Sequence, residues 1–188
     1  MHAGEFIMTG LKAGVGSAAI TPPVGIEMGM WALRKGLSQA VHDHMLTRAL
    51  VLDDGHDALA IVSMDVCAIS ADVTQQVRKL VAGATDISPG HILLNPSHTH
   101  TTPYTRRSKL SPGPDALTAG HRAYLDMFPH YVAGAIIEAW HSRQRASIGA
   151  ASTDVTGITI NRRDPALTVD PQLGVCRCGA EKHRAVLR

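Results

Sequence analysis

The feature that most constrains the fold is the order of elements expected in the first half of the chain. Residues 46–52 and 58–64 are strand-like, and the Asp- and Gly-rich turn between them predicts a hairpin. Ser70 is a typical N-cap for a helix to about residue 84, with an apolar stripe at helical spacing. An apolar run at residues 91–95 predicts a further buried strand. This order favours an α/β fold with a mixed sheet.

The segments on either side extend that pattern. Residues 11–21 predict an early strand, in which Gly14 and Gly16 permit bends or close backbone approach. Residues 25–44 show no sustained period and predict a long loop, a kind of segment that is often functional inside compact domains.

The second half of the chain contributes another helix and more strand. A long helix is expected over residues 118–143, where Pro129 should kink or interrupt it. Residues 146–160 alternate as a strand or hairpin would. The expected architecture is therefore an α/β fold in which a mixed sheet is flanked by two substantial helices.

Composition excludes several classes of function. The 188 residues suffice for one domain with a real core, and 45% of them are hydrophobic. A net charge of +2, with scattered basic residues, argues against nucleic acid as a partner. No apolar run approaches the roughly 20 residues that span a bilayer. The first eight residues lack the pattern of a signal peptide, so a cytoplasmic location is expected, and self-association stays open.

The three cysteines do not form a disulfide framework. Cys176 and Cys178 are too tightly spaced for the usual Cys-x-x-Cys metal pair. Cys67 is interpreted as a small buried core residue.

A His-x-His motif follows the strand expected at residues 91–95. Side chains on a strand alternate with period two, so His98 and His100 are expected to face the same way. Two imidazoles at the end of a strand can begin a metal site or a proton-transfer site. A catalytic zinc needs about three protein ligands, and the motif supplies two. The alternative, that the pair only hydrogen-bonds to loop backbone, stays open on spacing alone.

Two neighbouring residues are further candidates for the same site. Ser97 is rejected as a nucleophile, because no Gly-x-Ser-x-Gly elbow surrounds it and its neighbour His98 should point to the opposite face. Asp65 follows a strand, where α/β sheets often place site residues, but it could equally cap a turn. It is left out of the predicted site.

The order of several short blocks resembles the N-terminal domain of the neutral/alkaline non-lysosomal ceramidases. The resemblance spans residues 11–175, so we expect an incomplete domain of that family, preceded by an extension over residues 1–10 and followed by an aberrant or truncated tail over residues 176–188. The matching blocks are Ala13-Gly14-Val15-Gly16 to Ile20-Thr21-Pro22-Pro23-Val24-Gly25, Val41-His42-Asp43 with Arg48 to Asp53, Ser63-Met64-Asp65, His98-Thr99-His100, Asn161-Arg162-Arg163, Val169-Asp170-Pro171 and Gly174-Val175.

The resemblance implies an activity and a set of site residues. The family hydrolyses the amide bond of ceramide to sphingosine and a fatty acid, with one zinc ion that activates a water. By resemblance, His98 is a zinc ligand, His100 is a second active-site histidine close to the metal, and Arg162 lines the same site, with His42 in a loop nearby. Guanidinium donors stabilise developing negative charge, which would suit Arg162 for an oxyanion. The alternative is a surface arginine in a turn beside Asp164.

The chain departs from the family in its ligand set. The remaining zinc ligands of the family, a second His, a Glu and a Tyr, lie downstream of the matched region, and the surroundings of His183 do not resemble the block that carries the second His. The leading expectation is a zinc-dependent, ceramidase-like amide hydrolase that acts on a lipid or small-molecule amide. The alternatives are a hydrolase of another soluble amide, and a catalytically incomplete fragment that acts as a binding or assembly module.

Overall fold

A computed structural model describes residues 2–6, 10–29, 34, 36–105 and 116–180. His183 and the rest of the segment 181–188 lie outside the described residues. The elements in chain order are β1 (His2–Phe6), β2 (Lys12–Ala19), β3 (Leu46–Asp53), β4 (Ala58–Met64), α1 (Ala71–Ala82), the 3-10 turn η1 (Pro89–His91), β5 (Ile92–Pro96), α2 (Ala119–His141), β6 (Gln144–Asp154) and β7 (Gln172–Ala180).

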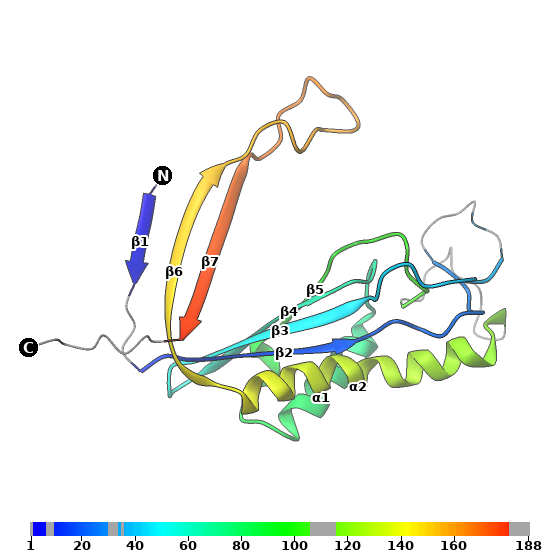
Figure 1. Ribbon diagram of the computed structural model, residues 1–188, viewed down its shortest axis with the longest axis horizontal. Helices are drawn as coiled ribbons and strands as arrows, with labels where there is room; N and C mark the ends of the chain where they lie inside the picture. Colours follow the sequence, from blue (N-terminus) through cyan, green and yellow to red (C-terminus); the bar gives the residue numbers. More distant parts are fainter. Residues whose placement is uncertain (1, 7–9, 30–33, 35, 106–115, 181–188) are drawn as a thin grey trace, which may run out of the picture.

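The expected α/β fold with a mixed sheet is confirmed. The strand order is β1-β6-β2-β3-β4-β5, and β7 pairs with residues 146–154 of β6 outside this order. Only β4 and β5 among the described strands are parallel, and α1 provides the crossover between them. Helices α1 and α2 lie against one face of β2–β5, whereas β6 leaves that sheet and rises with β1 and β7 as a separate ribbon (Figure 1).

The core lies between the sheet and the two helices. Strand β4 alternates strictly between buried and exposed residues, so that one face of the sheet supplies the core and the other faces outward. Along the outward face, Val15, Leu50, Ile61 and Leu93 are cross-strand neighbours in one row over β2, β3, β4 and β5. The main buried side chains are Val51 and Val62 from the sheet, Val73, Val77 and Val81 from α1, and Phe128, Val132 and Ile136 from α2.

Helix α2 lies directly on the backbone of β2. A Cβ atom on Gly16 would sit 2.2 Å from the carbonyl oxygen of Ala135, and one on Gly14 would sit 2.0 Å from that of Ala139. Both distances are far below van der Waals contact. Of the two reasons considered for these glycines, the structure supports close backbone approach.

The same helix satisfies part of the open edge of β2. Only the first two residues of β2 pair with β6, so the N–H and C=O groups beyond them need other partners. Ser142 Oγ donates to the carbonyl of Val15 at 2.9 Å, and Glu138 Oε2 accepts from the N–H of Ser17 at 2.8 Å. Side chains of α2 thus take the place of a neighbouring strand.

The helix boundaries agree with the capping signals. Ser70 is the N-cap residue of α1 by position, although its side chain makes no capping hydrogen bond, and the hydroxyl of Thr118 accepts from the N–H of His121 at the start of α2. Helix α2 is not interrupted at Pro129, which is buried within it. Phe128 and Val132, on either side of the proline, both belong to the buried core.

The two ends of the chain are more regular than the sequence suggests. Residues 2–6 pair with β6, and β7 continues past residue 175 to Ala180 in register with β6. The domain bounds at residues 10 and 175 stay a prediction. In the part of the chain that the structure describes, no helix has the length and apolarity to cross a membrane.

Candidate metal centre

The candidate site forms beyond the ends of β4 and β5. Because these strands are parallel neighbours, the loops that follow them leave the same edge of the sheet. The two loops are joined by hydrogen bonds: the N–H of His98 donates to the carbonyl of Val66 at 3.1 Å, and Thr105 Oγ1 donates to that of Ala68 at 2.6 Å. Residues 65–68 and 97–105 therefore lie side by side.

His98 and His100 lie in the loop and not on the strand. Strand β5 ends at Pro96, so the expectation that strand alternation aligns the two rings is wrong. His98 instead has φ +62°, a left-handed conformation in which histidine is enriched among non-glycine residues. This turn brings the two rings together edge to face, with centroids 5.1 Å apart and planes at 69°.

A backbone carbonyl orients the ring of His98. Its Nδ1 lies 2.8 Å from the carbonyl oxygen of Cys67, which requires an N–H at that nitrogen. The lone pair is then on Nε2. A hydrogen bond from one ring nitrogen to a backbone carbonyl is the usual arrangement of a metal-ligating histidine. The sequence left two interpretations of His98 open: a hydrogen bond to loop backbone, or a metal ligand. The structure shows that the ring can do both, with Nδ1 on the backbone and Nε2 free for a metal.

The donor atoms near His98 fit a zinc-type ion. The side-chain donors of Cys67, His98 and His100 all lie within 4.8 Å of one another. Sulfur and imidazole nitrogen are donors that zinc prefers. Cys67 is buried as expected, but outside the main core cluster. Sequence analysis missed its proximity, although it directly follows the strand adjacent to that of the histidines.

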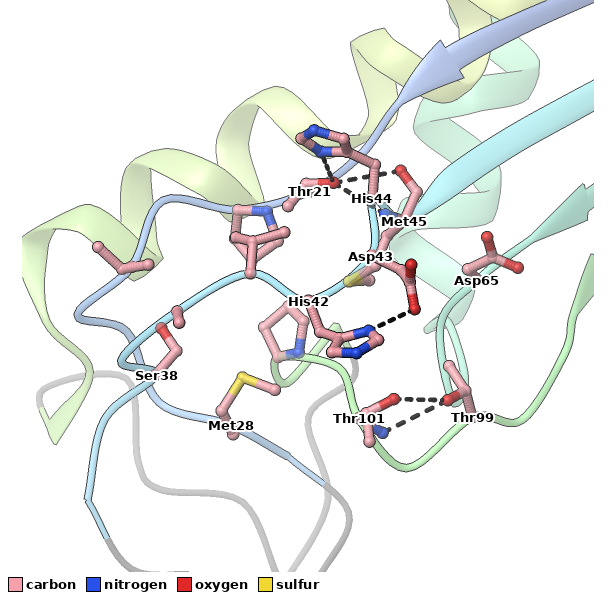
Figure 2. Close-up of a pocket in the computed structure, with 15 residues that line it drawn as sticks. Thr21, Met28, Ser38, His42, Asp43, His44, Met45, Asp65, Thr99 and Thr101 are labelled. Carbon is pink, nitrogen blue, oxygen red and sulfur yellow. Dashed lines mark hydrogen bonds and ion pairs between the residues drawn. The ribbon is translucent and has the colours of Figure 1, made fainter.

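A cavity of about 500 Å³ lies against the same loop, and Figure 2 shows Thr99 and Thr101 of that loop among the residues that line it. Thr99 and Thr101 line the cavity, whereas His98 and His100 belong to the group of possible metal ligands. One short loop therefore contributes residues to both the cavity and the candidate metal site. The other lining residues are Thr21, Pro22, Val24, Met28, Ser38, Ala40, Val41, His42, Asp43, His44, Met45, Asp65 and Pro103.

His42 and Asp65 both border the cavity. His42 is exposed, and its Nδ1 lies 2.7 Å from a carboxylate oxygen of Asp43 (Figure 2). Asp65 accepts from the N–H of Leu46 at 2.9 Å, so its carboxylate holds the start of β3 rather than the turn that follows it. His42 thus lies in a loop that borders the cavity, as the family resemblance implies.

Arg162 lies between β6 and β7 and is not among the three residues of the Cys67–His98–His100 group. It is exposed, and the loop that contains it joins β6 and β7 at the far end of the ribbon that rises off the sheet (Figure 1). The loop around it is a local turn, in which Asn161 Oδ1 accepts from the N–H of Arg163 and of Asp164. Its role in the site stays a prediction.

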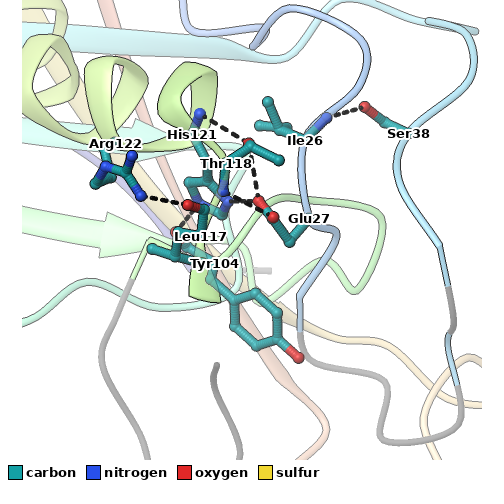
Figure 3. Close-up of polar contacts among 8 residues, drawn as sticks. All are labelled: Ile26, Glu27, Ser38, Tyr104, Leu117, Thr118, His121 and Arg122. Atoms are coloured by element: carbon teal, nitrogen blue, oxygen red, sulfur yellow. Dashed lines mark hydrogen bonds and ion pairs between the residues drawn. The ribbon is translucent and has the colours of Figure 1, made fainter. Parts of the chain in front are cut away.

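A buried polar network supports the loop that carries the histidines (Figure 3). His121 is fully buried, its Nδ1 lies 2.9 Å from Glu27 Oε2, and its Nε2 lies 2.9 Å from the carbonyl oxygen of Tyr104. Both partners are hydrogen-bond acceptors, so the ring of His121 joins the Glu27 carboxylate to the backbone of Tyr104. Glu27 also accepts from the N–H and the hydroxyl of Thr118 at the start of α2.

This network fixes one wall of the cavity. The N–H of Gly29 donates to the carbonyl of Thr102 at 2.7 Å, and Met28 forms a β-bridge with Pro103. The segment around Glu27 is thereby attached to the stretch that directly follows His100. Sequence analysis missed the network, because Glu27 and His121 carry no shared local motif.

We expect Glu27→Gln to lower stability by about 2 kcal/mol at neutral pH, since it removes the charged acceptor of several hydrogen bonds. Burial alone would raise the pKa of Glu27, but hydrogen bonds from backbone N–H, His121 and Thr118 outweigh it and lower the pKa below the ordinary 4.5. A lowered folded-state pKa gives stability that is present above about pH 4.5 and is lost as the pH falls through the folded-state value.

Urea denaturation of wild type and Glu27→Gln from pH 7 to pH 3 tests this prediction. The difference between the two proteins should shrink in the acid range. Asp126→Asn is the control. Asp126 is an exposed carboxylate on α2, the helix that carries His121, and its replacement should leave the free energy of unfolding unchanged at both neutral and acid pH. A pH-independent difference for Glu27→Gln would contradict the proposed ionised state of Glu27.

Comparison with known families gives the geometry its context. The model of the N-terminal domain of neutral/alkaline non-lysosomal ceramidases matches residues 11–177. The chain belongs to this ceramidase family. The matched range, residues 11–177, is close to residues 11–175, over which the ordered sequence blocks resemble the family.

Solved ceramidase structures have the same fold. A neutral ceramidase from Pseudomonas aeruginosa matches with a TM-score of 0.76 at 18% identity, over 91% of this chain and 30% of that one. A ceramidase complexed with C2 matches with a TM-score of 0.70 at 19% identity, over 91% of this chain and 29% of that one. The chain thus spans under a third of the length of these ceramidases. A search of curated protein sequences finds no match.

Proposed function

We propose that this chain is a zinc-dependent amide hydrolase of the ceramidase type, which converts N-acylsphingosine to sphingosine and a fatty acid. The observation that carries the proposal is the pairing of the His98 and His100 rings, with centroids 5.1 Å apart, in the loop that follows β5 and beside a cavity of about 500 Å³. Membership of the ceramidase family supports the reaction class.

The proposed roles follow from the ring contacts. His98 holds the metal through Nε2, because its Nδ1 donates to the Cys67 carbonyl. A bound zinc ion would act as a Lewis acid and lower the pKa of a water to about 7. His100 is exposed, beside His98, and would transfer a proton to the leaving amine. For Arg162, the proposed contact with the oxyanion rests on the family resemblance alone.

The cavity supports an amide substrate with an apolar part. Val24, Met28, Val41 and Met45 contribute aliphatic and thioether surface, which suits an acyl chain. Polar groups of Thr99 and Thr101 lie where the cavity meets the histidine loop, at the end that would hold the amide.

The second candidate is a binding or assembly module without activity of its own. The chain spans under a third of the length of the ceramidases it resembles, and the histidine pair alone gives fewer donors than a catalytic zinc needs. A soluble amide in place of ceramide is the third possibility, and the same experiment separates all three.

The test combines metal analysis with hydrolysis. We expect the purified chain, after dialysis against zinc, to retain one equivalent of the metal and to release fatty acid from micellar ceramide. A chelator should abolish the release, and added zinc should restore it. Release from short-chain soluble acyl amides alone would change the substrate to a soluble one. Retained zinc without hydrolysis of either class would favour the binding module, and absence of zinc would overturn the proposal.

A further inference from the structure

The loop between β6 and β7 carries a group of aliphatic side chains that face solvent. Among the described residues, fifteen large hydrophobic side chains are exposed, and six of them fall between residues 158 and 175. Within the loop itself, Ile158 is 78% exposed, Ile160 is 74% exposed and Leu167 is 57% exposed. Aliphatic side chains exposed together on a folded domain mark a surface that meets another molecule.

Local turns hold this loop away from the body of the protein. The N–H of Val155 donates to the carbonyl of Pro171 at 2.8 Å and closes the base of the loop, and the N–H of Leu167 donates to that of Asp164 at 3.0 Å. Nearly every residue from 156 to 170 is exposed. The loop stands at the far end of the ribbon of β6 and β7, where it is drawn in orange (Figure 1). Its aliphatic side chains are therefore presented outward and do not pack on the core.

The charged groups of the loop add a cationic surface. Arg162 and Arg163 are both exposed, and neither takes part in the ion pairs formed within the described residues. The carboxylates of Asp164 and Asp170 instead accept from backbone N–H groups two residues ahead, at 3.0 Å and 2.9 Å. The acidic groups are thus turned onto the loop, whereas the guanidinium groups are available to bind phosphate, which suits their planar donor geometry.

We propose that this loop docks on a bilayer that contains anionic phospholipid, with Ile158, Ile160 and Leu167 inserted at the acyl-chain boundary and Arg163 on a headgroup phosphate. Apolar side chains flanked by cations bind a bilayer surface through buried apolar area and attraction to anionic lipid. The choice of lipid as the partner rests on the proposed function, because an N-acylsphingosine substrate is itself a lipid. The inference adds the segment of the chain that meets the lipid surface.

A second copy of the chain is the competing occupant of this surface. A specific protein interface buries about 800 Å² on each partner, and three aliphatic side chains on a projecting loop supply only part of that area. Insertion among acyl chains needs no matching surface, because the gain is roughly proportional to the apolar area that leaves water. The shape of the loop therefore favours lipid.

The test is cosedimentation of the chain with sucrose-loaded phosphatidylcholine vesicles, with and without phosphatidylserine. We expect the wild type to bind the vesicles that contain phosphatidylserine. The variant Ile158→Ser/Ile160→Ser should bind them more weakly, by about 10-fold or more for each aliphatic side chain removed. Arg163→Gln should weaken binding to these vesicles about 5-fold and leave binding to phosphatidylcholine alone unchanged. The charge variant is made at Arg163 because Arg162 has a proposed role in the reaction.

Val15→Ser/Leu93→Ser is the matched control. These two aliphatic side chains are 69% and 57% exposed, but they lie on the outward face of the sheet, so their loss should leave vesicle binding unchanged. A thermal melt of each variant checks its folding. A tryptophan introduced as Ile160→Trp should also shift its fluorescence emission to the blue when vesicles are added, because insertion moves the indole ring out of water.

The docking role and the proposed function fail separately. Absence of vesicle binding by the wild type, or equal binding by the wild type and the loop double variant, would overturn the docking role. A dimer in gel filtration that the loop variant dissociates, without vesicle binding, would assign the surface to a second copy. Vesicle binding without amide hydrolysis would overturn the function and keep the docking role. Hydrolysis of micellar ceramide without vesicle binding would do the reverse.

Discussion

Replacing His98 by glycine should abolish stoichiometric zinc binding while the protein stays folded. The change removes the Nε2 lone pair that the Cys67 carbonyl orients, and loss of a direct ligand should weaken zinc at least as much as loss of a supporting contact, by about 100-fold or more. Glycine is the appropriate replacement because His98 has φ +62°, a region that glycine adopts without steric penalty. Isothermal titration with zinc, alongside a thermal melt, measures both properties.

The control for this variant is His130→Ala. His130 is an exposed histidine on α2, remote in sequence from the loop, so its loss should leave zinc affinity unchanged. If His98→Gly retains wild-type affinity for zinc while the control behaves as expected, the proposed metal centre is wrong.

Replacing Gly16 by alanine should destabilise the protein by about 3 kcal/mol or more, at the upper end of overpacking effects. The new Cβ would lie 2.2 Å from the carbonyl oxygen of Ala135 and 2.7 Å from the backbone nitrogen of Ala139. Both contacts are with helix backbone, which cannot rotate away as a side chain can. Helix α2 would have to move off β2, which would also lengthen the contacts of Ser142 and Glu138 with that strand.

Gly149→Ala is the matched control for the glycine prediction. Gly149 also lies in a strand, β6, and an added Cβ there meets no atom within 4 Å. Its replacement should be neutral or slightly stabilising, because glycine loses more conformational entropy on folding than alanine does. Equal stability of the two variants in urea denaturation would show that α2 does not lie on the backbone of β2.

Local signals predicted most of the fold. Turn residues, helix caps and periodic apolar residues predict the β3–β4 hairpin, α1 and α2, because each of these signals acts over only a few positions. The pairing of β1 with β6 and the full length of β7 were not predictable in this way. Both depend on contacts between distant segments, such as residue 2 with residue 152, and leave no local pattern.

The candidate site was predicted in part, and for a partly wrong reason. His98 and His100 do lie together, but a left-handed turn aligns them and not strand alternation. Cys67 was judged from its residue type, which indicates burial and says nothing of its neighbours. Glu27 and His121 are 94 residues apart, and only the docking of α2 against the loop at residues 26–29 brings them into contact.

Because β4 alternates strictly between buried and exposed residues, adjacent positions on this strand should differ sharply in their tolerance to substitution. Ile61 and Val62 are nearly the same in chemistry, yet Val62 is sealed against the helices while Ile61 is 38% exposed on the outer row. A mutational scan along this strand should therefore record intolerance and tolerance at every other codon. The exposed side chains of this row can therefore be replaced, with any effect that this has on binding at the outer face, while the core packing that stabilises the fold is unchanged.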